Sequence, residues 1–82
     1  MMSLKEIVDK PFETGIEIAI MGRLITEARW QHQPEEELKL HLLREGLERQ
    51  ATLRYDADQW EQFRAGLLEG RNRNAKYVYN TP

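Results

Sequence analysis

The residues of this chain that could do acid–base or nucleophilic chemistry are few and widely spaced. The sequence of 82 residues has two histidines, His32 and His41, one serine, Ser3, and no cysteine. A nucleophilic hydrolase needs a serine, cysteine or threonine beside a base that a third group orients. Each histidine has an acidic residue nearby, but neither has a credible nucleophile. We therefore expect no enzymatic activity.

The spacing of possible metal ligands argues against a bound cofactor. His32 and His41 lack the four-residue spacing that places two histidines on one face of a helix. The pair Asp56 and Asp58 is better explained by helix capping and the helix dipole. The five glycines stand singly, without the Lys-Ser/Thr signature of a phosphate-binding loop. The sequence predicts neither a metal nor another cofactor.

Composition is typical of one small globular domain. The chain is 40% apolar and 32% charged, which is too apolar for disorder and too interrupted for a membrane span. The most apolar run, 16–25, contains Glu17 and Arg23 and lies too far from a basic start to be a signal peptide. The lack of cysteine fits a reducing compartment. We expect a single cytoplasmic domain over 1–82 with no membrane segment.

The segment 15–33 fits both a helix and a hairpin. As a helix it places five apolar residues on one face: Ile18, Met21, Leu24, Ile25 and Ala28. As a hairpin it turns at Gly22, and three alternating isoleucines share one face: Ile16, Ile18 and Ile20. Glycine in a helix interior costs about 1 kcal/mol relative to alanine. The alternation and the glycine favour the hairpin.

The segment 37–55 presents the same choice. Pro34 followed by three glutamates is a good helix start. However, a turn at Glu45-Gly46 would pair two strands that both alternate. The first strand contains Leu38, Leu40 and Leu42, and the second contains Leu47, Ala51, Leu53 and Tyr55. We interpret this segment as a second hairpin.

The clearest helix covers 57–69. Asp56 is its predicted N-cap, and Gln59 follows three residues later as in a capping box. Its apolar stripe is Trp60, Phe63 and Leu67, joined by Ala57 and Leu68. Gly70 is predicted to end it. Residues 71–82 are then an exposed basic and aromatic tail, and the N-terminal segment 1–14 contains a short helix over 3–9.

These elements predict an α+β fold, with a small antiparallel sheet of two β-hairpins over 15–55 and one α-helix, 56–70, packed on it. The alternative is an all-α arrangement of about four short helices. A chain this short buries only about 60% of its unfolded surface, and a second copy often completes such a core. The second face of the predicted sheet keeps an apolar surplus, which we expect a second copy or a protein partner to cover: Met21, Ile25 and Leu43.

Basic residues on the predicted strands suggest a second kind of surface. With one tryptophan they would line a groove for single-stranded nucleic acid: Arg23, Arg29, Trp30, Lys39, Arg49 and Arg54. However, 12 basic and 14 acidic residues give a net charge of −2, and the acidic residues are interleaved with the basic ones. The chain therefore has no general attraction for a polyanion.

The predicted order of elements resembles a known family. Gly22-Arg23-Leu24-Ile25 before Trp30, and Ala51-Thr52-Leu53 followed by Asp56-Ala57-Asp58-Gln59-Trp60, are similar to the transcriptional positive-coactivator family of single-stranded-DNA-binding proteins. The resemblance covers 15–69 and implies four curved strands, a dimerising helix and nucleic-acid binding. The chain departs from the family in its net acidity and in the run Glu35-Glu36-Glu37.

Two functions follow as expectations. The first is a small non-catalytic protein-interaction or regulatory adaptor module that self-associates, in keeping with the small size and the surplus apolar face. The alternative is a single-stranded nucleic-acid-binding protein that uses a strand-borne basic face.

Overall fold

The structure, a computed structural model, describes the backbone of residues 9–80 and the side chains of residues 9–76. Three helices fill almost all of this range: α2 (Pro11–Trp30), α3 (Pro34–Arg54) and α4 (Ala57–Asn80). No strand occurs within it. The predicted sheet of two hairpins is therefore wrong, and the fold is all-α, with long helices in place of short ones. The short helix predicted over 3–9 lies outside the described residues.

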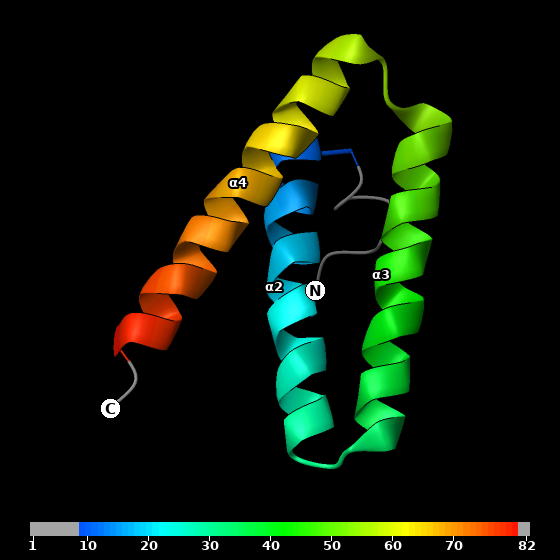
Figure 1. Cartoon of the computed structure of the whole chain (residues 1–82). Coiled ribbons are helices and arrows are strands. Elements are labelled where there is room, and N and C mark those ends of the chain that lie inside the picture. The colour runs from blue at the N-terminus through cyan, green and yellow to red at the C-terminus, as the bar shows by residue number, and fades with distance from the viewer. Residues whose placement is uncertain (1–8, 81–82) are drawn as a thin grey trace.

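α2 is the middle helix of the arrangement. α3 runs antiparallel along one side of it, and α4 packs against it on another side (Figure 1). α4 crosses α2 obliquely, so that its C-terminal half leads away from α3 (Figure 1). The packing of the described chain thus depends on α2, because the other two helices both pack along it.

This central position explains why the first hairpin was predicted wrongly. A helix packed on one side shows a single apolar stripe, whereas a helix packed on two sides carries apolar residues more densely around its circumference. Ile16 lies near Gly70 of α4, and Ile18 joins the core with residues of α3 and α4. The isoleucine alternation therefore reflects two packed sides of one helix. Gly22, the predicted turn, lies within α2.

The second predicted hairpin is also one continuous helix. The predicted turn at Glu45-Gly46 lies in the interior of α3. Residues two apart on a helix point about 200° apart, so the alternating leucines separate onto opposite sides. Leu40 is half-buried near Ala28 of α2, whereas Leu38 and Leu42 are exposed.

The turn between α2 and α3 is a Schellman-type helix end. His32 has a φ of 54°, in the left-handed region that usually needs glycine or asparagine. The Gln33 N–H donates to the Ala28 carbonyl at 2.9 Å, and Pro34 then begins α3. Sequence reasoning missed this helix end because the residue in the left-handed position is a histidine.

The start of α4 confirms the predicted capping box. The Gln59 N–H donates to Asp56 Oδ1 at 2.8 Å, and the Asp56 N–H donates to Gln59 Oε1 at 3.0 Å. The predicted end at Gly70 is wrong, because α4 continues to Asn80. The backbone of 71–80 is therefore helical and not an extended tail.

Glycines let α2 and α4 touch backbone to backbone. A Cβ on Gly15 would collide with the backbone oxygen of Phe63, and one on Gly66 would collide with the backbone oxygen of Phe12. A Cβ on Gly70 would lie 2.5 Å from the Ala19 Cβ. All three glycines are buried. Gly66 and Gly70 are therefore required by the helix crossing, and Gly70 is not a helix stop.

One residue from each helix forms the centre of the core: Ile18, Leu47 and Phe63. Tyr55 and Trp60 pack against them, with their ring centroids 5.6 Å apart in an edge-to-face arrangement. Burial raises the pKa of the Tyr55 hydroxyl above its ordinary value, and a hydrogen bond with the Thr14 side chain opposes this shift. The predicted core positions of Trp60 and Phe63 are confirmed, whereas Leu68 is exposed.

The glycine crossing predicts opposite effects for two Gly→Ala substitutions. Gly66→Ala should lower the free energy of unfolding by at least about 2 kcal/mol, because the two backbones must move apart. Gly22→Ala is the matched control, since only the flexible Arg44 side chain, at 4.0 Å, approaches that position. It should raise stability by up to about 1 kcal/mol through helix propensity. Urea denaturation measures both, and a Gly66→Ala chain as stable as the parent would contradict the described contact.

Candidate functional site

The six residues predicted to line a basic groove do not share one face. Three of them are held by polar partners within the chain. Arg29 pairs with Glu37 at 2.8 Å, and Arg54 pairs with Asp9 at 3.1 Å. Arg23 is held between α2 and α4. The strand-borne basic face is therefore absent from the described residues.

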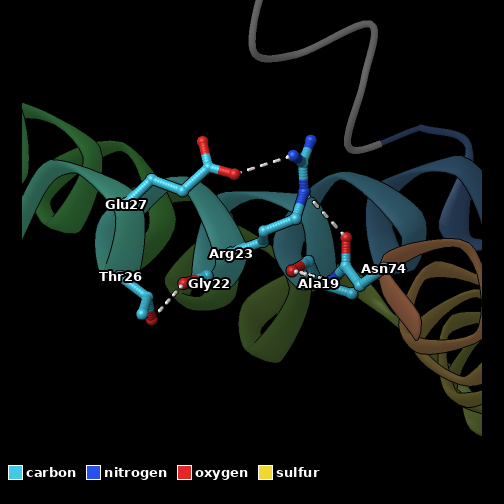
Figure 2. A network of polar contacts seen from close by, with 6 residues as sticks. All are labelled: Ala19, Gly22, Arg23, Thr26, Glu27 and Asn74. Carbon is cyan, nitrogen blue, oxygen red and sulfur yellow. Dashed lines mark hydrogen bonds and ion pairs between the residues drawn. The ribbon is translucent and has the colours of Figure 1, made fainter. Parts of the chain in front are cut away.

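Arg23 belongs to a polar network that ties α4 to α2. Figure 2 shows its side chain between Glu27 and Asn74. Arg23 Nη1 lies 3.0 Å from Glu27 Oε1, and Arg23 Nε donates to Asn74 Oδ1 at 3.1 Å. Asn74 Nδ2 in turn donates to the Ala19 carbonyl at 2.9 Å (Figure 2). The network fixes the C-terminal half of α4 on α2, beyond the glycine contacts.

The other three predicted nucleic-acid residues lie apart from this network. Trp30 is 80% exposed at the end of α2. Lys39 and Arg49 are exposed on α3. They share a helix with Arg54, but the Arg54 side chain is engaged with Asp9.

The residues predicted to bind a partner are divided between core and surface. Met21 packs against the core cluster, and Ile25 is buried. Leu43 is half-buried and lines a depression on α3. Of these three residues, Leu43 is thus the one that lines the depression on α3.

An apolar depression on the described surface lies on α3. Leu38 and Leu42 are 59% and 60% exposed, and they are one helical turn apart. With Leu43 and Gly46 they line a shallow depression of about 420 Å³. Leu47 and Ala51, on the opposite side of α3, are buried. The face of α3 turned away from the core therefore carries leucines as well.

We call this surface the outer face of α3. It consists of Glu35, Leu38, Lys39, Leu42, Glu45, Gly46, Arg49 and Leu53. Strand patterning did not point to this surface, because it placed Leu38, Leu40 and Leu42 together on one predicted strand. A helix predicted over this segment would have shown two apolar stripes, and the second stripe is the outer face of α3.

The outer face of α3 carries four charges: Glu35, Lys39, Glu45 and Arg49. None of the four forms an ion pair with another described residue. Elsewhere on the same helix, Arg44 pairs with Glu48 at 3.1 Å and Glu37 pairs with Arg29. The charges of the outer face therefore differ from these in having no ion-pair partner among the described residues.

A second hollow lies where α3 and α4 diverge. Its apolar lining includes Ile18, Phe63 and Leu67, and its volume is about 310 Å³. Arg44 and Arg71 stand among its polar lining residues. Ile18 and Phe63 are buried core residues, so this hollow offers less exposed apolar surface than the outer face of α3.

The histidines lie in different settings. His32 occupies the left-handed position of the α2–α3 turn, and His41 Nε2 lies 4.0 Å from Glu37 Oε1. Among residues 9–76, no three His, Cys, Asp or Glu side chains gather where they could hold a metal ion. In the same part of the chain no helix is both long and apolar enough to cross a membrane.

Comparison with known proteins does not assign this chain to a family. No family model, no curated protein and no solved structure matches this chain. The resemblance to the positive-coactivator family rested on two hairpins before a helix, and the described residues contain no strand.

The polar network predicts a specific loss for one asparagine. Asn74→Ala should lower the free energy of unfolding by about 1–2 kcal/mol, because it removes two hydrogen bonds and leaves the Ala19 carbonyl without this donor. Asn72→Ala, at an exposed position on the same helix, should change stability by less than about 0.5 kcal/mol. Urea denaturation of both variants measures the difference. Equal stabilities would show that the network does not hold α4 on α2.

Proposed function

We propose that this chain is a small, non-catalytic protein-interaction module that docks a protein partner on the outer face of α3. We place it in the cytoplasm, on the ground that a chain without cysteine suits a reducing compartment. The exposure of Leu38 and Leu42 carries the proposal.

The energetics of these two leucines support a docking role. Covering an exposed leucine side chain is worth about 1.5–3 kcal/mol. Single exposed apolar residues are ordinary, but neighbouring ones rimmed by charges are typical of interaction sites. Leu38 and Leu42 share a depression with Leu43, and Glu35 and Lys39 stand at its rim. This arrangement has the apolar centre and polar rim of a protein interface.

A charge imbalance on α4 favours nucleic-acid binding as a second candidate. Beyond residue 62 the described side chains of this helix include four basic residues and one acidic residue: Arg64, Arg71, Arg73 and Lys76, with Glu69. Arg73 pairs with Glu69 at 3.0 Å, which reduces the imbalance. A binder of this kind would depend on phosphate contacts and lose affinity steeply with salt.

Site-specific photo-crosslinking in the source cells tests the protein-docking proposal. A photoreactive phenylalanine analogue in place of Leu42, and separately in place of Leu38, should give the same discrete protein adduct. The matched control is the analogue in place of Leu68, which is 59% exposed on α4, against 60% for Leu42. Adducts no stronger from α3 than from position 68 would overturn the proposal.

Titration with labelled single-stranded oligonucleotides separates the second candidate. Nucleic-acid binding through α4 predicts an affinity that falls at least about tenfold between low and high salt. It also predicts that Arg71→Glu weakens binding while Leu42→Glu leaves it unchanged. No binding at low salt would exclude nucleic-acid binding, and protein docking would be the remaining candidate function.

A further inference from the structure

We propose that the outer face of α3 binds the same face of a second copy of this chain, with the two α3 helices packed antiparallel about a two-fold axis at Leu42. This inference rests on the proposed function and names the partner. It is carried by the arrangement of charges and leucines around Leu42.

The outer face has complementary chemistry on the two sides of Leu42. Glu35 precedes Leu42 by as many residues as Arg49 follows it, and Lys39 and Glu45 are related in the same way. In an antiparallel pair centred on Leu42, a residue before this point in one copy is level with its counterpart in the other. Glu35 of each copy then faces Arg49 of the other, and Lys39 is level with Glu45. Each of these two residue pairs therefore consists of one acidic and one basic residue and has no net charge.

None of these four charges forms an ion pair with another described residue, a property that they share with other exposed charges of the chain. Glu35 and Arg49 lie about two helical turns from Leu42, on the same face as this leucine. The antiparallel arrangement therefore supplies two equivalent Glu35–Arg49 pairs and places the two helix dipoles side by side in opposite directions, which is favourable. A parallel arrangement would instead put Glu35 against Glu35 and Arg49 against Arg49, and like charges in register are unfavourable.

Leucine and glycine positions match in the same register. Leu42 meets Leu42 at the axis, and Leu38 of one copy is level with Gly46 of the other. No atom outside the helix lies within 4 Å of a Cβ built on Gly46. The glycine therefore leaves space into which the leucine of the other copy can pack. Both leucines lose their exposure in this arrangement.

Analytical ultracentrifugation of the full chain tests the inference. We expect a reversible dimer with a Kd of about 1–100 µM, since an interface formed by one helix face without aromatic residues is of moderate strength. A sedimentation coefficient that stays that of a monomer up to about 500 µM would overturn the inference.

Two leucine variants locate the interface. Leu42→Glu should abolish dimerisation, because it places two like charges at the axis. Leu68→Glu, which changes an equally exposed leucine on α4, should leave the Kd unchanged. Circular dichroism shows that each variant is folded. A dimer that survives Leu42→Glu, or that Leu68→Glu disrupts, would place the interface elsewhere.

Charge reversal tests the antiparallel register. Glu35→Arg and Arg49→Glu should each raise the Kd about tenfold, since each turns two attractive pairs into two repulsive ones. The double variant restores opposite charges and should return the Kd to within about threefold of the parent value. A double variant that dimerises no better than the single ones would exclude this register.

The failure of this inference is distinguishable from the failure of the proposed function. A monomeric chain whose position-42 crosslinks contain a different protein would retain the docking surface and reject the second copy as its occupant. A monomeric chain without specific crosslinks from positions 38 and 42 would reject both.

Discussion

Direct backbone contact between α2 and α4 is the constraint on which the rest of the structure depends. Gly15 and Gly66 lie where the two helices approach most closely, and a Cβ on either would meet the backbone of the other helix. Such an approach offsets the conformational cost of glycine in a helix interior by bringing many atoms into van der Waals contact. Asn74 extends the contact through its hydrogen bonds to Arg23 and Ala19. Glycine contacts thus hold α4 on α2 at Gly66, and the hydrogen bonds of Asn74 hold it farther along the helix.

This close crossing determines what remains for α3. With one side of α2 occupied by α4, α3 packs on another side and contributes Leu47 to the shared core. Its own second row of leucines, Leu38 and Leu42, faces away and stays exposed. No described residue covers this row, and the four charges of the outer face form no ion pair with another described residue. The proposal of a partner with complementary charges in the reverse order rests on these two observations.

Part of the architecture could be predicted from the sequence. The capping box at Asp56 and Gln59 is local chemistry, because both hydrogen bonds form between residues three apart in sequence. Trp60 and Phe63 were placed in the core because their spacing fits one face of a helix that packs on one side. The outer face of α3 was missed, and of the residues predicted to meet a partner only Leu43 borders it.

The sequence by itself determined the small size, the absence of cysteine, the start of α4 and the aromatic part of the core. Tertiary structure alone decided between strand and helix in 15–54. The local sequence patterns in this range favour strand and helix about equally. A helix buried on two sides has almost no single apolar stripe, and glycines such as Gly22 and Gly46 are as typical of turns as of helix contacts. Only the packing of α2 between two other helices breaks this balance, because helix propensity is weak compared with the burial of Ile18, Leu47 and Phe63. The role of Gly66 and Gly70 was likewise undetermined, since a cap and a contact glycine have the same residue type and differ only in what lies opposite them.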